Sequence, residues 1–274
     1  MEQVLHAIVM GIVQGLTEFL PISSSGHLIF VPWFFGWDDP FLESLAFSVV
    51  LHGGTLAALL VYFRDDWRRL IPAGFATLRD RSFAGDPDRR LAWLLVASTI
   101  PAMVAALLFN DIIETNVRQV GLVAVMLVIG ARILWAADRW GPRTHVIERL
   151  TFRGAIGIGV AQALALIPGV SRSGISMSAA LFAGLDRADA ARYSFLMATP
   201  ITAMAVAYET LKLVKGDVGG AEPLTLLAGV VASFVAGILA IAVLLRYLRT
   251  NSFTVFVVYR VVIAAIIVVA FLAR

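Results

Sequence analysis

The chain has 274 residues, of which 59% are hydrophobic and only 15% are charged, and its mean hydropathy is +0.86. Because soluble domains carry about 25% charged residues, this composition excludes a soluble globular domain and indicates a polytopic membrane protein. The chain has no cysteine, which excludes disulfides, thiolate catalysis and cysteine metal ligands. The net charge of +3 comes mainly from loop arginines and indicates membrane orientation rather than nucleic-acid binding.

Six segments are apolar and long enough to cross a membrane as helices. A helix needs about 20 residues to span roughly 30 Å of hydrocarbon. The segments are 41–63, 91–110, 118–137, 190–212, 223–246 and 253–273. We therefore expect an all-α polytopic membrane protein with about six transmembrane helices.

Two further apolar regions are interrupted by polar turns at Pro21 and at Pro168-Gly169. Their arms are 3–19 and 22–35 in the first region, and 153–167 and 174–185 in the second. Each arm is short for a full span, and irregular backbone is tolerated at depth only where protein or a cavity covers it. We expect two re-entrant helix-loop-helix hairpins. Eight full spans in a thinned bilayer are the alternative.

The arginines are concentrated in two loops, 64–90 and 138–153. If both loops lie in the cytoplasm, the six spans alternate consistently and both termini lie outside. The first hairpin then enters from outside and the second from the cytoplasm. We expect one integral membrane domain, 1–274, built from two inverted-topology repeats at about 1–140 and about 150–274.

The two halves share a polar pattern. A shift of 148 residues aligns, without a gap, Gly11 with Gly159, Gln14 with Gln162, Leu16 with Leu164, Ser23 with Ser171, Ser25 with Ser173 and Gly26 with Gly174. Polar residues in apolar membrane segments are costly and mark a functional site. A duplicated pair of polar turns predicts one site where the two repeats meet near the membrane midplane.

The first turn reads Pro21-Ile22-Ser23-Ser24-Ser25-Gly26-His27. Before it, Gln14 and Glu18 are four residues apart and share one helix face. Glu18 in an apolar run needs a nearby cation or donor. The serine hydroxyls and free backbone N–H groups can cap the next helix, and His27 can face the same cavity as Ser24.

The second turn reads Pro168-Gly169-Val170-Ser171-Arg172-Ser173-Gly174. Arg172 near two helix N-termini predicts an anion site, and its planar fork suits phosphate. A carboxylate, an imidazole, hydroxyls and an arginine can together perform phosphoryl transfer. The alternatives are a buried structural ion pair for Arg172 and serines that bond to backbone carbonyls.

Both motifs resemble the bacterial undecaprenyl-diphosphate phosphatase family of the bacitracin-resistance type. The resemblance rests on Gln14-x-x-x-Glu18 with the serine-rich turn up to Leu28, and on the second motif from Pro168 to Ser176. At Ser176 the family usually has threonine, which keeps a hydroxyl. Length and span layout extend the resemblance to essentially the whole chain.

The resemblance implies hydrolysis of undecaprenyl diphosphate to undecaprenyl phosphate and inorganic phosphate. That reaction recycles the lipid carrier for cell-wall synthesis and gives bacitracin resistance, in the bacterial cytoplasmic (inner) membrane. The resemblance also implies an inverted-repeat fold and a divalent cation, Mg²⁺ or Ca²⁺. The expected partners are a polyprenyl diphosphate lipid and the bilayer, without nucleic acid. A homodimer is left open.

The residue roles follow from chemistry. Glu18 is expected to hold the metal, with Gln14 beside it, and Arg172 to clamp the diphosphate. Ser24 is the expected nucleophile, with His27 taking and returning its proton. Direct attack by a metal-activated water is the alternative. The other candidate substrate-binding residues are Ser23, Ser25, Gly26, Gly169, Ser171, Ser173, Gly174 and Ser176.

Two other functions are weighed. A secondary transporter or flippase for an anionic lipid substrate would use the same inverted repeats and broken helices. A PAP2-type lipid phosphatase would need a histidine six residues after its arginine, where this chain has Ser178. The remaining histidines are interpreted as structural, although His52, in mid-span beside two glycines, is placed to line the cavity.

Overall fold

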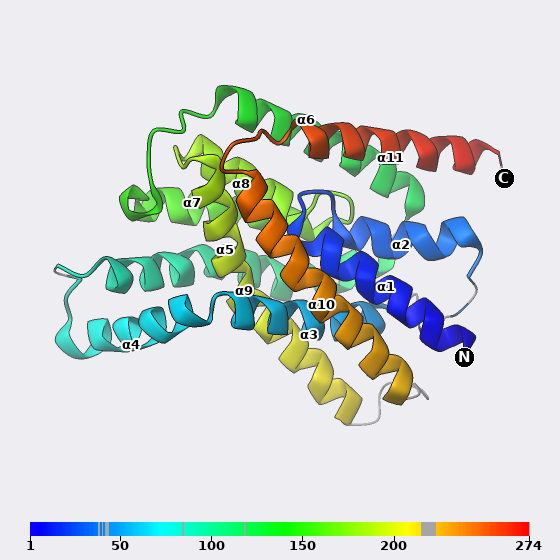
Figure 1. The fold of residues 1–274 in the computed structure, drawn as a ribbon, viewed down its shortest axis with the longest axis horizontal. Helices are drawn as coiled ribbons and strands as arrows, with labels where there is room; N and C mark the ends of the chain where they lie inside the picture. The colour runs from blue at the N-terminus through cyan, green and yellow to red at the C-terminus, as the bar shows by residue number, and fades with distance from the viewer. Residues whose placement is uncertain are drawn as a thin grey trace.

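The structure is a computed structural model that describes residues 1–37, 39, 41, 44–83, 85–117, 119–214 and 223–273. Over these ranges the chain forms eleven α-helices and two 3₁₀-helices and no β-strand (Figure 1). They are α1 (Glu2–Phe19), α2 (Ser24–Phe35), α3 (Leu45–Tyr62), α4 (Arg64–Asp80), α5 (Pro87–Asn116), α6 (Val120–Trp140), η1 (Ile147–Arg149), α7 (Phe152–Ala163), η2 (Leu164–Leu166), α8 (Arg172–Phe182), α9 (Arg187–Val214), α10 (Pro223–Tyr247) and α11 (Thr254–Leu272).

Four of the described helices are long and apolar enough to cross a membrane: α5 over Pro87–Phe109, α6, α10 and α11. A fifth candidate joins α3 to α4, but the two helices bend by 82° at their junction. The chain is therefore an all-α polytopic membrane protein. The predicted spans at 41–63 and 190–212 are helical as α3 and α9, but neither passes this test alone.

The charged region 64–90, expected to be a loop, contains helix α4. The helix buries Leu70, Ala73 and Thr77 on one face and leaves its charged residues other than Asp66 exposed. Ion pairs three residues apart, such as Arg69 with Asp66 at 2.8 Å, support the helix. High charge is compatible with an amphipathic helix whose narrow apolar face packs on the protein.

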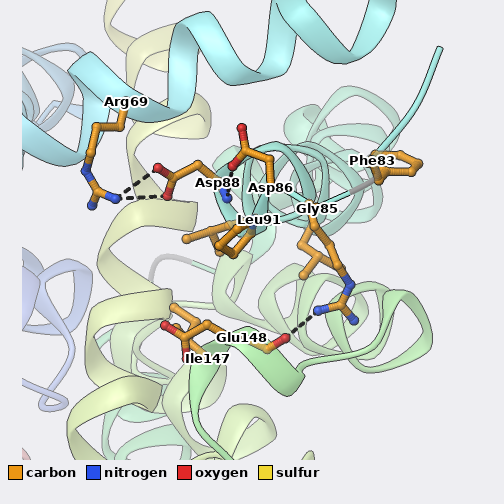
Figure 2. Close-up of a pocket in the computed structure, with 11 residues that line it drawn as sticks. Arg69, Phe83, Gly85, Asp86, Asp88, Leu91, Ile147 and Glu148 are labelled. Carbon is orange, nitrogen blue, oxygen red and sulfur yellow. Dashed lines mark hydrogen bonds and ion pairs between the residues drawn. The ribbon is translucent and has the colours of Figure 1, made fainter. Parts of the chain in front are cut away.

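A pocket of about 360 Å³ lies beside α4, where α5 begins and η1 follows α6 (Figure 2). Both Arg69 and Arg90 in its lining donate to other lining residues. Arg69 donates to both carboxylate oxygens of Asp88 at 3.0 Å, and Arg90 donates to the carbonyl of Glu148 at 2.6 Å. The pocket contains none of the site residues predicted from the sequence.

The two halves of the chain exchange packing partners. Helix α1 of the first half packs along α10 of the second half. Helix α7 is the counterpart of α1 under the shift of 148 residues, and it packs along α5 of the first half. Figure 1 shows α1 beside α10 across the middle of the molecule. Glycines permit these close approaches: a Cβ at Gly11 would overlap the carbonyl of Gly229, and one at Gly159 would overlap the carbonyl of Ser98.

The two chain ends lie on the same side of Figure 1, whereas α4 and the connection from α6 to α7 lie on the opposite side. This arrangement agrees with the expectation that the termini share one side of the membrane and the arginine-rich segments share the other. Which side faces the cytoplasm stays a prediction from the positive-inside rule.

Candidate active site

The two hairpins turn with the same local geometry. Ser23 and Ser171 both have φ of 76°, which is uncommon for a residue with a side chain. Each caps the next helix, because its hydroxyl accepts a hydrogen bond from the backbone N–H three residues later: Gly26 at 3.4 Å and Gly174 at 3.1 Å. The first helical residue after each cap is a predicted site residue, Ser24 in α2 and Arg172 in α8.

The two turns are bonded directly to each other. The backbone N–H of Gly169 donates to the hydroxyl of Ser23 at 3.1 Å. In return, the hydroxyl of Ser173 donates to the carbonyl of Leu20 at 3.0 Å. Residues about 150 positions apart in the sequence therefore meet, and the first residues of α2 and α8 are held near each other.

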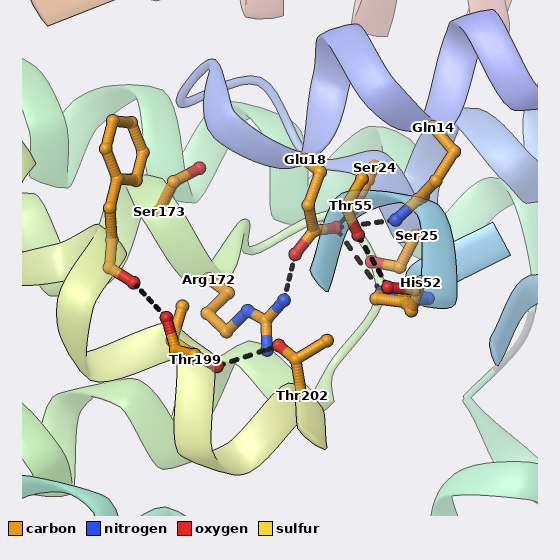
Figure 3. A network of polar contacts seen from close by, with 12 residues as sticks. Gln14, Glu18, Ser24, Ser25, His52, Thr55, Arg172, Ser173, Thr199 and Thr202 are labelled. Carbon is orange, nitrogen blue, oxygen red and sulfur yellow. Dashed lines mark hydrogen bonds and ion pairs between the residues drawn. The ribbon is translucent and has the colours of Figure 1, made fainter. Parts of the chain in front are cut away.

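Glu18, at the C-terminal end of α1, is the centre of the resulting polar network (Figure 3). One carboxylate oxygen pairs with the guanidinium of Arg172. The other accepts from the hydroxyl of Ser24 at 2.5 Å and from the amide of Gln14 at 3.0 Å, and lies 3.4 Å from Nε2 of His52. Glu18 is buried, and these partners offset the cost of burying its charge.

Arg172 joins the second hairpin to α9 as well as to Glu18. Its other terminal nitrogen donates to the hydroxyl of Thr202 at 2.7 Å, and that hydroxyl donates to the carbonyl of Ala198 at 2.8 Å. The ion pair considered for Arg172 as an alternative is thus present. The Arg172 side chain keeps 21% of its surface exposed and that of His52 keeps 22%, while the Glu18 side chain keeps 3%. The network is therefore reached from the side of Arg172 and His52.

The structure does not join Ser24 and His27 by a hydrogen bond. The His27 Nδ1–H donates to the carbonyl of Ser23 at 2.7 Å, and its Nε2 accepts from the hydroxyl of Tyr259 at 2.9 Å. The ring bonds back along its own helix and outward to α11, whereas Ser24 at the start of α2 bonds to α1. A catalytic role for His27 stays a prediction.

His52 enters the network where sequence reasoning had favoured a structural role. Its Nδ1–H donates to the carbonyl of Ser48 at 2.6 Å, so Nε2 can donate to Glu18 only when the imidazole is protonated. Gly54 brings α3 against α10, since a Cβ there would overlap the carbonyl of Val230. In the sequence, the feature that could have indicated this role is the position of His52 in mid-span, directly before Gly53 and Gly54.

The other predicted binding residues build the turns. Ser171 and Ser173 contact each other at 3.2 Å, and Ser25 contacts Ser23 at 3.4 Å. Ser176 is fully buried and donates to the backbone carbonyl of Arg172 at 2.7 Å. These contacts match the alternative in which membrane serines bond to the backbone and to each other. Direct substrate contact by these serines stays a prediction.

Comparison with known proteins decides the family. The family model described as bacitracin resistance protein BacA matches residues 7–266. The chain belongs to this family.

Related proteins are similar to this chain in sequence along almost its whole length. The chain is 47% identical to an undecaprenyl-diphosphatase of Gemmatimonas aurantiaca and 46% identical to one of Desulforudis audaxviator, over 98% of each chain in both comparisons. It is 44% identical to an undecaprenyl-diphosphatase of Moorella thermoacetica over 99% of each chain.

The side chains around Glu18 can be compared with the ligands that a divalent cation needs. Within the described ranges, no group of three or more His, Cys, Asp or Glu side chains forms a ready metal cluster. The amide oxygen of Gln14 is buried without a hydrogen-bond partner among the described residues. Mg²⁺ is often held by one or two carboxylates together with substrate phosphates. Glu18 and Gln14 fit a cation bound in that way.

Proposed function

We propose that this chain hydrolyses undecaprenyl diphosphate to undecaprenyl phosphate and inorganic phosphate. Membership of the BacA family and relatives named undecaprenyl-diphosphatase support this reaction rather than the transporter or flippase alternative. The observation that carries the proposal is the contact of one buried carboxylate, Glu18, with both a hydroxyl, Ser24, and a cation, Arg172, supplied by two separate hairpins.

Arg172 is the anchor for the diphosphate. Its planar guanidinium can bind phosphate oxygens through paired N–H groups. The start of α8, where Arg172 lies, adds the partial positive charge of a helix N-terminus. Binding transfers Arg172 from the carboxylate of Glu18 to the phosphates, which frees the carboxylate oxygen that Arg172 contacts.

Ser24 is the nucleophile in this proposal. Its Oγ attacks the terminal phosphorus, the bond from that phosphorus to the bridging oxygen breaks, and undecaprenyl phosphate leaves. Glu18 takes the Ser24 proton, because the two oxygens lie 2.5 Å apart. Water then hydrolyses the serine phosphate and releases inorganic phosphate, with Glu18 accepting the water proton as Ser24 regains its own.

Two other side chains contact the carboxylate of Glu18. Gln14 donates to the same carboxylate oxygen as Ser24, and Nε2 of His52 lies 3.4 Å from that oxygen. A divalent cation held by Glu18, Gln14 and the phosphates would neutralise charge on the diphosphate. Direct attack by water in place of Ser24 is the competing mechanism.

The membrane setting suits a lipid substrate. We place the protein in the bacterial inner membrane, since helical spans are typical of that membrane and outer-membrane proteins are barrels. Hydrolysis there would return the carrier lipid to cell-wall synthesis and lower sensitivity to bacitracin. A homodimer stays a prediction.

The direct test is phosphate release from undecaprenyl diphosphate by purified protein in detergent, with and without EDTA. Arg172→Ala is expected to lose roughly 10³-fold or more of the activity. The matched control, Arg132→Ala, removes an exposed arginine of the membrane helix α6 and is expected to keep it. EDTA is expected to stop release and added Mg²⁺ or Ca²⁺ to restore it. No release by folded wild-type protein, across several cations and prenyl chain lengths, would contradict the proposal.

A further inference from the structure

Arg260 of α11 is a buried arginine that lies outside the proposed chemistry. It has no exposed surface, and all five of its hydrogen bonds to described residues go to backbone carbonyls. The acceptors are Gly169 at 2.8 Å, Val170 at 2.9 Å, Leu127 at 3.1 Å, Pro21 at 3.3 Å and Met126 at 3.4 Å. Three of these carbonyls belong to the two turns, and two belong to α6.

The breaks in the hairpins explain why a cation is stable at this place. Pro21 follows the end of α1, and Gly169 and Val170 follow the end of η2. Carbonyls at helix ends lack intrahelical partners, and inside a membrane no bulk water replaces them. Helix C-termini also carry partial negative charge. The guanidinium and the two helix ends therefore compensate one another.

The surrounding glycines leave the space that the guanidinium occupies. A Cβ at Gly130 of α6 would overlap the guanidinium, and a Cβ at Gly174 of α8 would lie 2.9 Å from Nη1. Gly121, on the same helix as Gly130, would place a Cβ in open space. The two α6 glycines therefore form a matched pair for substitution.

We propose that Arg260 is a positioning residue that fixes the two turns relative to each other. Arg260 takes no part in the chemistry itself. Its link to the site runs through Gly169, whose carbonyl accepts from Arg260 and whose N–H donates to Ser23, the residue before Ser24. The neighbouring Tyr259 bonds to His27, so consecutive residues of α11 hold the first hairpin. The predicted effect on turnover rests on the proposed phosphatase function, whereas the effect on the turns does not.

Kinetics of two variants test the proposal. Arg260→Lys keeps the positive charge but replaces the five N–H donors of the planar guanidinium by the three donors of an ammonium group. Gly130→Ala leaves Arg260 in place but pushes its guanidinium aside. Misplacement by about 1 Å can cost about 10²-fold in rate, so we expect kcat to fall at least about tenfold, with KM changed far less. Gly121→Ala and Arg132→Lys are expected to match wild type.

Hydrogen exchange gives a readout that needs no activity. Both variants are expected to exchange faster in peptides covering residues 20–28 and 167–176, with α10 unchanged. Wild-type kcat and unchanged exchange in these peptides would overturn the proposal. Faster exchange throughout the chain, α10 included, would also overturn it, because it would show a general effect on stability. If wild-type protein fails to hydrolyse the lipid, the phosphatase proposal fails and exchange alone decides the role of Arg260.

Discussion

At the level of single residues, the two halves contribute different side chains to the polar network. Under the shift of 148 residues, Glu18 corresponds to Leu166 and Arg172 corresponds to Ser24. The carboxylate therefore comes from one half and the arginine from the other, while the capping serines Ser23 and Ser171 are shared. The two turns share one geometry, and the side chains that they place in the polar network are complementary in charge.

The role of Ser24 can be tested by trapping. With substrate labelled in its terminal phosphate, rapid acid quenching of wild-type protein is expected to leave label on the peptide that contains Ser24. Ser24→Ala should lose the label and at least about 10²-fold in kcat, since both the nucleophile and its proton transfer are removed. Ser252→Ala, in the connection before α11, serves as the control. Full activity of Ser24→Ala would instead support direct attack by water.

The sequence allowed the central residues of the site to be predicted, but not all of their partners. Glu18, Ser24 and Arg172 lie in recognisable motifs, and the repeat implied that these motifs meet. Thr202 gave no signal, because a threonine in an apolar helix usually bonds to its own backbone. Spacing along α2 suggested that Ser24 and His27 act together, but it does not reveal that α11 supplies Tyr259 as the partner of His27.

Among the elements, α10 is the helix against which α1 and α3 pack. Three glycines, Gly11, Gly15 and Gly54, bring α1 and α3 so close that an added Cβ would overlap α10 carbonyls. The hydroxyl of Ser233 on α10 also donates to the carbonyl of Leu51 at 2.9 Å. Small residues at helix contacts are the usual means of close packing in membranes.

Substitution of one of these glycines should weaken the fold. Gly11→Leu forces a side chain against the backbone of α10, which typically costs about 1–3 kcal/mol or more. Gly157→Leu places the same side chain where a Cβ meets no atom within 4 Å. In thermal unfolding in detergent, Gly11→Leu is expected to melt several degrees below Gly157→Leu. Equal melting temperatures would show that the α1–α10 contact is not tight.

Hydropathy predicted most of the helices but not α4. The segment 64–90 was expected to be a loop because of its charges, yet α4 uses a narrow apolar face. Helix α9 is less apolar than the other spans because it presents polar residues such as Ser194, Thr199 and Thr202 to the protein interior. A hydropathy profile does not distinguish polarity that faces water from polarity that faces a buried site.

At the scale of the whole molecule, exchange of packing partners places the site at the centre. Because α1 packs on α10 and α7 packs on α5, each hairpin is held by helices of the other half. The two turns then meet, and α11 binds both of them through Arg260. The composition predicted a membrane protein and the repeat predicted two related halves. The exchange of partners is a property of tertiary packing, and neither composition nor repeat specifies it.

The central claim is that the two turns form one active site, and a double-mutant cycle tests it most directly. Phosphate release would be measured for wild type, Ser24→Ala, Arg172→Lys and the double variant, with Arg172→Lys chosen to keep measurable activity. Groups that act together show coupling of about 0.5–3 kcal/mol and strongly non-additive losses. The structure predicts a double variant about as active as the more damaged single variant. A double variant whose loss equals the product of the two single losses would show that the turns act independently.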